Sequence, residues 1–199
     1  MPAPVLYYLR HGLTDWNVAG RLQGRHDIPL NAQGRAQAVQ CAAILRDLFA
    51  REGRAPKDYD YVSSPLARAS ETMDLLRAAL DLDAGGYTRE PRLAEIAFGE
   101  WEGLTYQDVL ERENNMVQKR EGNKWRFRPP GGETYEEVAQ RVGAWHATLT
   151  RDTVIVAHGG TARALIAHLG IVAPEEATHY SIDQGVAYVF ADGNVTHYE

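Results

Sequence analysis

The stretch LYYLRHGLTDWN (residues 6–17) decides the fold, because its character changes abruptly near its middle. Residues 6–9 are large and have high β propensity, which is typical of a short buried strand. A cation, an imidazole and a residue without a side chain follow at Arg10, His11 and Gly12. A strand that ends in this way is expected to carry its last residues into a functional site.

A second strand ends in the same way. The run TVIVAHGG (residues 153–160) is short, continuous and rich in β-branched residues, which predicts a central strand covered on both faces. In open α/β sheets, ligands bind outside the carboxyl ends of the strands. We therefore expect His11 and His158 to project toward one site. A third strand, YDYVSS (residues 59–64), leads to Arg68 on the first turn of a helix, with Pro65 as a candidate first helical residue.

Strand-like and helix-like segments alternate along the chain, which favours an α/β layered domain. Apolar residues recur with helical spacing over residues 31–52 and 66–80, and Thr134 with Glu137 fits a capping box. Residues 185–198 predict two strands around a turn. A length of 199 residues favours one domain, residues 1–199. The segment 111–130 is the least regular.

Composition excludes several classes of protein. The net charge of −6 and the lack of a basic stripe argue against a nucleic-acid partner. No apolar run approaches the ~18 residues of a membrane helix, and no signal peptide is visible, so the cytoplasm is the expected location. The single cysteine, Cys41, rules out a disulfide framework. Without a metal-binding or P-loop motif, we expect no metal and no cofactor.

The residues at the two strand ends suit a phosphoryl group. Arginine forks match the fan of phosphate oxygens, and glycines allow the backbone to approach the ligand closely. A helix that begins after Gly160 would aim its N–H groups at an anion. Flanking arginine charge lowers the pKa of a histidine, which favours the neutral form that can attack phosphorus. The pattern therefore indicates phosphoryl chemistry.

Six ordered blocks between residues 5 and 169 resemble the histidine phosphatase superfamily, also called the phosphoglycerate mutase-like family. The blocks are LRHGLTDWN (9–17), RLQGRHDIPLNAQGRAQA (21–38), SSPLARASET (63–72), LAEIAFGEWEG (93–103), PGGETYEEV (130–138) and VAHGGTARAL (156–165). The resemblance implies a three-layer α/β/α sandwich with a mixed, mostly parallel central sheet.

The resemblance also implies roles for individual residues. His11 is expected to be the nucleophile that becomes phosphohistidine. The predicted phosphoryl-oxygen contacts are Arg10, Arg68 and His158, and the further phosphate or substrate contacts are Thr14, Asn17, Gln23, Gly24 and the backbone of Gly159. For the proton-transfer step, the residues alone leave Glu95, Glu100 and Glu102 open. Only the resemblance selects Glu95 as the acid.

Three functions fit these residues. Mutases of the family that the chain resembles usually carry an insertion with a paired-Arg patch after the acid-bearing loop. Here the corresponding segment is short and lacks an Arg-Arg pair, so the resemblance favours a metal-independent phosphatase acting on a small phosphorylated metabolite. The alternative is a cofactor-dependent mutase of the phosphoglycerate mutase type, since Lys119, Arg120, Lys124, Arg126 and Arg128 could bind a second anion. A non-enzymatic binder would normally lose His11 or Glu95. Monomer and homodimer both remain open.

Overall fold

The computed structural model describes residues 3–199, and its centre is one six-stranded sheet. The strands are β1 (Leu6–Arg10), β2 (Asp60–Ser63), β3 (Thr88–Arg89), β4 (Thr153–Ala157), β5 (Ala187–Ala191) and β6 (Asn194–Tyr198). Their order across the sheet is β3-β2-β4-β1-β5-β6. The pairs β3-β2, β2-β4 and β4-β1 are parallel, whereas β1-β5 and β5-β6 are antiparallel. The predicted mixed, mostly parallel sheet is confirmed.

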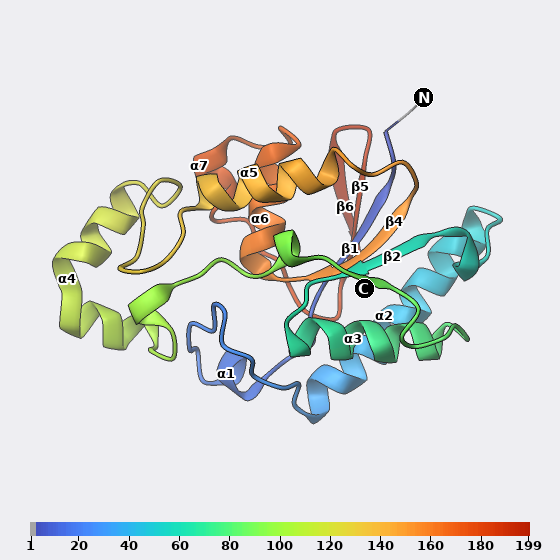
Figure 1. Cartoon of the computed structure of the whole chain (residues 1–199), viewed down its shortest axis with the longest axis horizontal. Helices are drawn as coiled ribbons and strands as arrows, with labels where there is room; N and C mark the ends of the chain where they lie inside the picture. The colour runs from blue at the N-terminus through green and yellow to red at the C-terminus, as the bar shows by residue number, and fades with distance from the viewer. Residues whose placement is uncertain (1–2) are drawn as a thin grey trace.

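Helices cover both faces of this sheet (Figure 1). The α-helices are α1 (Asp15–Val18), α2 (Ala32–Arg51), α3 (Ala67–Ala79), α4 (Tyr106–Gly122), α5 (Tyr135–His146), α6 (Gly159–His168) and α7 (Pro174–Ala177). Short 3₁₀ helices are η1 (Pro56–Asp58), η2 (Pro91–Leu93) and η3 (Gly99–Trp101). Within residues 3–199 no helix is both long and apolar enough to cross a lipid bilayer.

The alternation of side chains in β1 explains the layers. Leu6 and Tyr8 pack into one apolar core with residues of α5 and α6, whereas Tyr7 and Leu9 pack into another with residues of α2 and α3. Successive residues of a strand point to opposite faces, so a strand apolar at every position must be covered on both. The three-layer α/β/α architecture is thereby confirmed.

The topology brings three strand ends together. β4 lies between β1 and β2, and Arg10 at the end of β1 is in register with Ala157 at the end of β4. On the other side, Ser63 of β2 is in register with Val156. The three strands are therefore neighbours, and this is the condition for the predicted convergence of their terminal residues.

Side-chain caps begin several of the helices, and one helix boundary differs from expectation. Thr134 and Glu137 form the predicted capping box at the start of α5. α3 begins at Ala67, so Pro65 is not its first residue. The reason is that the Asp27 carboxylate accepts the Ala67 N–H at 2.6 Å and so fixes the start of the helix from a distant loop.

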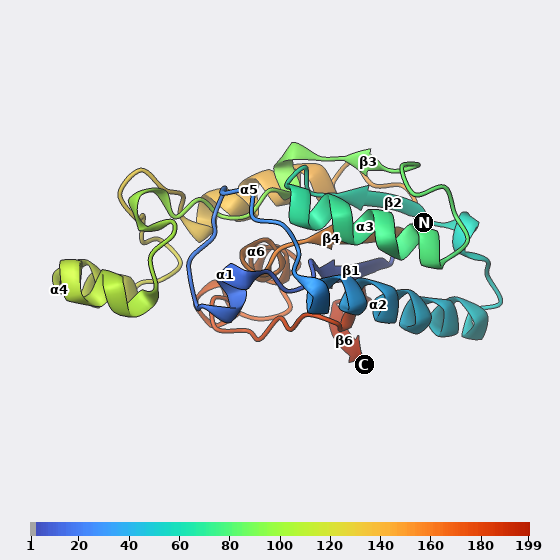
Figure 2. The same ribbon diagram turned by 90° about the horizontal axis from the view of Figure 1, so that it is seen from below.

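The segment 111–130 is more regular than expected, because α4 extends to Gly122. Thr105 and Asp108 form a capping box at its start, and the helix is kinked at Glu113. Only Val109 and Val117 of α4 are buried. Few apolar residues therefore repeat with helical spacing, so the sequence pattern does not reveal this helix. α4 lies at one end of the molecule, away from the sheet (Figures 1 and 2).

Candidate active site

A cavity of about 160 Å³ opens at the carboxyl ends of β1 and β4. Most of the predicted site residues line it: Arg10, His11, Asn17, Gln23, Gly24, Arg68, Glu95 and Gly159. His158 and Thr14 do not line it. The strand ends, the first turn of α3 and the loops at residues 21–24 and 95–98 thus meet around one small polar space.

His11 is buried and its ring is fixed by two neighbours. Its Nδ1 lies 2.8 Å from the carbonyl oxygen of Gly12, and a carbonyl only accepts hydrogen bonds, so Nδ1 carries the proton. Nε2 therefore keeps its lone pair and accepts from Arg68 Nε at 3.2 Å. A neutral imidazole with an unprotonated Nε2 is the form that a nucleophile needs.

The pKa of His11 supports the same protonation state. Burial is the largest cause that holds the pKa of His11 well below its usual value of 6.5, and the charges of Arg68 and Arg10 lower it further. The predicted lowering of this pKa rested on the arginine charges alone. The difference arises because burial cannot be deduced from the order of residues around His11.

Arg68 is fully buried and holds a loop as well as the nucleophile. Its Nη1 donates to the carbonyl of His26 at 2.7 Å, and its Nη2 donates to the carbonyl of Gly24 at 2.9 Å. Arg10 donates from Nη1 to Ile182, but its buried Nε has no hydrogen-bond partner within residues 3–199. A buried N–H without a partner is costly. The predicted contact of Arg10 with a phosphoryl oxygen remains a prediction.

His158 lies behind His11. The two ring centroids are 5.1 Å apart, and His158 Nε2 lies 2.7 Å from the hydroxyl oxygen of Ser64. Burial, followed by the charge of Arg68, lowers the pKa of His158 well below 6.5. Its Nδ1 is buried without a partner within the described residues. The predicted contact of His158 with the phosphoryl group remains a prediction.

The three candidate acids occupy different environments. Glu95 lines the cavity, and its carboxylate accepts from the N–H groups of Ile96 at 2.9 Å, Gly160 at 3.2 Å and Thr161 at 3.2 Å. Glu100 is exposed, and Glu102 accepts from the backbone of two loops. The structure thus places Glu95 alone, among these three, at the cavity.

The start of α6 differs from expectation. The N–H groups of Gly160 and Thr161 at the first turn of α6 do not face an open space but hold the Glu95 carboxylate. A carboxylate at a helix N-terminus is stabilised by the helix dipole. A Cβ on Gly160 would lie 2.4 Å from Glu95 Oε1, so the glycine is required for this close approach.

Thr14 supports the cavity from behind. It is fully buried, and its hydroxyl lies 3.1 Å from the backbone nitrogen of Asn17 and 3.0 Å from Gln23 Oε1. Asn17 is further fixed by Gln184, whose amide donates to its side-chain oxygen at 3.0 Å. Thr14 therefore orients two lining residues, and the structure does not place its hydroxyl at the cavity surface.

Sequence reasoning missed several lining residues. Arg163 lies one helical turn after Gly159 on the same face of α6, and this i, i+4 spacing was the available signal. Tyr135, Phe98, Leu22 and Arg21 also line the cavity. Arg21 donates to the Gly103 carbonyl at 2.6 Å.

The two aromatic residues after α4 are anchors to the core. Trp125 is buried and stacks on Tyr135 with centroids 6.2 Å apart. Phe127 stacks on Trp101 at 5.4 Å. Since Tyr135 lines the cavity, Trp125 supports its wall from the far side.

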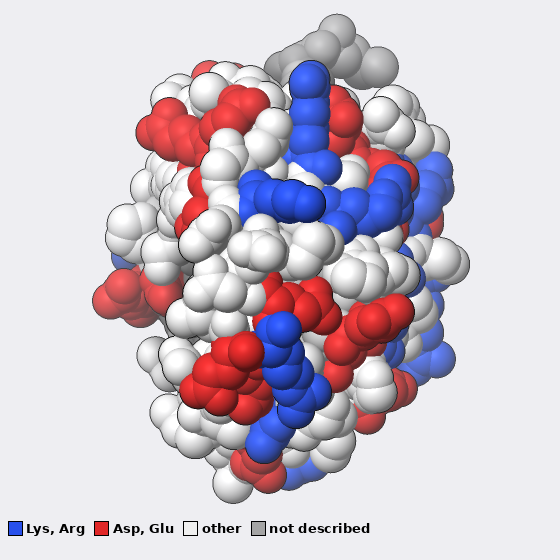
Figure 3. Space-filling model, turned by 90° about the vertical axis from the view of Figure 1, so that its left-hand side faces the viewer, with Lys and Arg blue, Asp and Glu red and all other residues white. Residues whose placement is uncertain are grey.

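Charges at the α4 end are largely compensated. Figure 3 shows this end, where cationic side chains lie among acidic ones. Arg120 pairs with Glu121 at 2.9 Å and Arg126 with Glu136 at 3.5 Å, and Arg128 pairs with Glu137. Three of the five cations that suggested a second anion site are thus already paired with glutamates.

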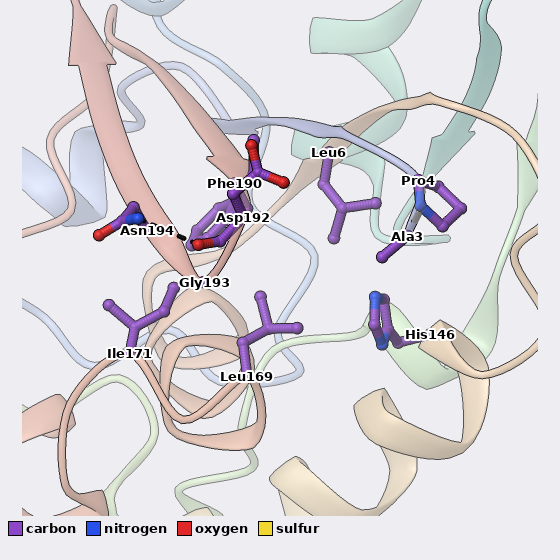
Figure 4. A pocket seen from close by; sticks show the side chains of 11 residues that line it. Ala3, Pro4, Leu6, His146, Leu169, Ile171, Phe190, Asp192, Gly193 and Asn194 are labelled. Carbon is purple, nitrogen blue, oxygen red and sulfur yellow. Dashed lines mark hydrogen bonds between the residues drawn. The ribbon is translucent and has the colours of Figure 1, made fainter. Parts of the chain in front are cut away.

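A second cavity has a different character. It has a volume of about 130 Å³ and lies at the amino end of β1, where Leu6, Leu169 and Phe190 form apolar walls beside His146 (Figure 4). No lysine or arginine is among its described lining residues, so it does not suit a phosphate. Within residues 3–199 no three His, Cys, Asp or Glu side chains gather as a metal-binding set.

Comparison with known proteins agrees with this geometry. The chain is 36% identical over 183 residues to glucosyl-3-phosphoglycerate phosphatase of Mycobacterium tuberculosis, covering 85% of this chain and 76% of that protein. It is 28% identical over 200 residues to a 2,3-bisphosphoglycerate-dependent phosphoglycerate mutase of Gloeobacter violaceus, covering 95% and 87%.

A solved structure has a similar fold. The α-ribazole phosphatase of Shigella flexneri superposes with a TM-score of 0.77 at 28% identity, covering 96% of this chain and 93% of that one. The family model of the histidine phosphatase superfamily, branch 1, matches residues 6–191. The match covers almost the whole chain and includes the cavity residues described above, and the chain therefore belongs to the histidine phosphatase superfamily.

Proposed function

We propose that the protein hydrolyses the phosphate monoester of a small metabolite in two steps, with His11 as the covalent nucleophile. The observation that carries this proposal is the neutral His11 ring, whose Nε2 lone pair lies beside Arg68 in a cavity that also contains Glu95. Phosphoryl transfer requires positioning and charge stabilisation more than covalent chemistry by the protein. The cavity supplies both.

In the first step, Nε2 of His11 attacks phosphorus and the bond between phosphorus and the ester oxygen breaks. Arg10 and Arg68 stabilise the charge on the equatorial oxygens, because guanidinium groups match phosphate geometry. Glu95, in its protonated form, gives its proton to the leaving oxygen. The products of this step are the free alcohol and phosphohistidine, with Glu95 ionised.

In the second step, Glu95 takes a proton from water as the water oxygen attacks phosphorus. The bond between phosphorus and Nε2 breaks, so inorganic phosphate leaves and His11 regains its lone pair. Glu95 ends the cycle protonated, ready for the next substrate. The same carboxyl thus serves as acid and then as base, as microscopic reversibility requires.

The mutase alternative is favoured by one observation, the 28% identity to a bisphosphoglycerate-dependent mutase over nearly the whole chain. In a mutase, phosphohistidine would return its phosphoryl group to an alcohol and not to water. The compensated charges of Arg120, Arg126 and Arg128 reduce the cationic surface for a second anion, which favours hydrolysis.

The test is turnover of p-nitrophenyl phosphate in the presence of EDTA by the wild type and by His11→Ala. We expect turnover that resists EDTA and is abolished in the variant, with the fold retained by circular dichroism. Near-normal activity in His11→Ala would contradict the mechanism, and loss of wild-type activity in EDTA would contradict metal independence. Transfer of the phosphoryl group between phosphoglycerates without phosphate release would favour the mutase.

The substrate is proposed to be a small phosphorylated metabolite, and the protein is proposed to act in the cytoplasm. Glucosyl-3-phosphoglycerate and α-ribazole phosphate, the substrates named for two similar proteins, belong first in a substrate panel. A preference of at least tenfold in kcat/KM over p-nitrophenyl phosphate would identify a natural class of substrate.

A further inference from the structure

Two loops of different origin meet beside the cavity. One loop, residues 23–26, follows α1 and contributes Gln23 and Gly24 to the cavity wall. The other, residues 95–102, carries Glu95. The nucleophile and the acid therefore sit on separate parts of the chain, and the contacts between these loops link the two parts, in addition to the α6 N–H groups that hold the Glu95 carboxylate.

The first loop is tied to the nucleophile. Arg68, which donates to His11 from Nε, also donates to the carbonyls of Gly24 and His26. All these contacts come from one buried guanidinium, so residues 24–26 and the His11 ring share a single rigid support.

The two loops are joined to each other by Glu102. Its Oε1 accepts from the backbone nitrogen of Arg25 at 3.1 Å and from that of Phe98 at 3.0 Å. The approach is close enough that a Cβ on Gly24 would lie 2.0 Å from the same oxygen. Gly24 also has a φ of +50°, which favours glycine.

Glu133 makes a second joint between the loops. Its Oε2 accepts from Arg25 Nη2 at 3.0 Å and from the backbone nitrogen of Ala97 at 2.9 Å. Arg141 donates to both Glu133 oxygens, at 3.2 and 3.3 Å, and to the carbonyl of Glu95 itself at 3.3 Å. Glu133 does not line the cavity, so it acts on the reaction only through these contacts.

We propose that Glu133 is a positioning residue that fixes the backbone carrying Glu95 relative to the loop that Arg68 ties to His11. The inference rests on the proposed function, because it concerns the proton transfers of Glu95. It goes beyond that function by assigning a role to a carboxylate outside the cavity. A misplacement of a catalytic group by about 1 Å can cost on the order of 100-fold in rate, so a contact that fixes the position of Glu95 affects catalysis.

The charge of Glu133 is essential to this role. Burial alone would raise the pKa of Glu133, but Arg141 and the N–H of Ala97 outweigh it, so the group is held ionised. Three of the four donors, Arg25 Nη2, the Ala97 N–H and Arg141 Nη2, meet Oε2, and Arg141 Nε meets Oε1. An amide of the same shape can keep one accepting oxygen, but it turns its NH₂ group toward Arg141 Nε and loses the charge that attracts both arginines. Glu133→Gln therefore weakens the joint without changing its volume.

The test is Glu133→Gln assayed with p-nitrophenyl phosphate and with phenyl phosphate, two esters of similar size whose leaving groups differ in basicity. We expect kcat/KM to fall by about tenfold or more for phenyl phosphate, which needs the acid, and by less than about threefold for p-nitrophenyl phosphate. With the latter, rapid quench is expected to show a larger steady-state fraction of phosphohistidine than in the wild type, because water activation is slowed.

The matched control is Glu71→Gln, which removes the partner of Arg35 on the outer face of α3 with the same chemical change. It is expected to leave both substrates and the phosphohistidine fraction unchanged. Equal losses for the two esters in Glu133→Gln, without accumulation of phosphohistidine, would overturn the positioning role. If Glu133→Gln does not fold, Arg25→Gln, at a 41% exposed side chain, is expected to show the same leaving-group selectivity, and its absence there would also overturn the proposal.

Failure of the proposed function and failure of the positioning role give different experimental results. Wild-type turnover that survives His11→Ala would contradict the proposed function. Wild-type turnover that depends on His11 and on Glu95, together with a Glu133→Gln variant that behaves like Glu71→Gln, would contradict only the positioning role.

Discussion

His11 combines two properties that are set by different contacts. The Gly12 carbonyl fixes the proton on Nδ1, and burial with two nearby arginines disfavours a second proton. In long-range ¹H–¹⁵N NMR spectra, we expect His11 as the neutral Nδ1–H tautomer at pH 6.5 and no titration until the pH is well below that value. An Nε2–H tautomer, or a midpoint near 6.5, would contradict the assignment of the nucleophilic atom.

Arg68 shows how much one side chain contributes to the site. It contacts the nucleophile and two carbonyls at once, and it is expected to hold phosphoryl oxygens. Arg68→Ala is expected to lower kcat/KM for p-nitrophenyl phosphate by about 10²–10³-fold, as for loss of a donor to a developing oxyanion.

Arg68→Lys keeps the charge but not the planar fork, so we expect it to recover little of that loss. Full activity in the lysine variant would show that charge alone matters at this position, and would remove the geometric role assigned to the guanidinium.

At the scale of elements, the first turn of α6 and the Glu95 loop depend on one glycine. Gly160→Ala would place a Cβ 2.4 Å from Glu95 Oε1 and 2.6 Å from Ile96 Cγ2. The alanine itself suits a helix, so the loss is expected in catalysis, on the order of 10²-fold in kcat/KM through displacement of Glu95.

Gly122→Ala at the end of α4 is the control, since its Cβ would meet nothing within 4 Å and Gly122 does not line the cavity. We expect no loss there under the same conditions. A Gly160→Ala variant as active as Gly122→Ala would show that the Glu95 carboxylate does not need its place at the helix end.

The helices and strands differ in how well the sequence predicts them. β1 is apolar over residues 6–9 and β4 over residues 154–157, and both lead into distinctive residues, so their place at the centre of the sheet was predictable. α4 was not predictable, because it buries little and its apolar stripe is thin. The start of α3 was misplaced because its cap comes from Asp27, which is 40 residues away in sequence.

The same contrast holds for the site. Residues that precede or follow glycines at strand ends, such as His11 and His158, are visible as local patterns. Arg163 is marked only by its i, i+4 spacing from Gly159, and Tyr135 reaches the cavity only through the packing of α5, so no local pattern marks it. The choice of Glu95 over Glu102 depended on resemblance, and the reason for it is a contact with a helix start 65 residues later.

At the scale of the whole molecule, two buried histidines make stability depend on pH. The pKa values of His11 and His158 lie well below 6.5 in the folded state, mainly because both are buried, and near 6.5 in the unfolded chain. The unfolded state therefore binds more protons as the pH falls below 6.5, and the free energy of unfolding falls with it. Each group contributes up to about 1.4 kcal/mol per pH unit.

Urea denaturation between pH 7 and 5 measures this dependence. We expect His11→Gln to reduce the slope of unfolding free energy against pH by up to about 1.4 kcal/mol per unit relative to the wild type. An unchanged slope would mean that His11 is protonated in the folded state, contrary to its burial beside Arg68.

Covalent capture tests most directly whether the phosphoryl group is carried on His11. Wild type and Glu95→Gln would be mixed with p-nitrophenyl phosphate, quenched at alkaline pH within milliseconds, digested and analysed by mass spectrometry. We expect acid-labile phosphate on the peptide that contains His11, in a larger fraction of the Glu95→Gln chains because water activation is impaired. Turnover without phosphate on that peptide in either protein, or phosphate on another residue, would contradict it.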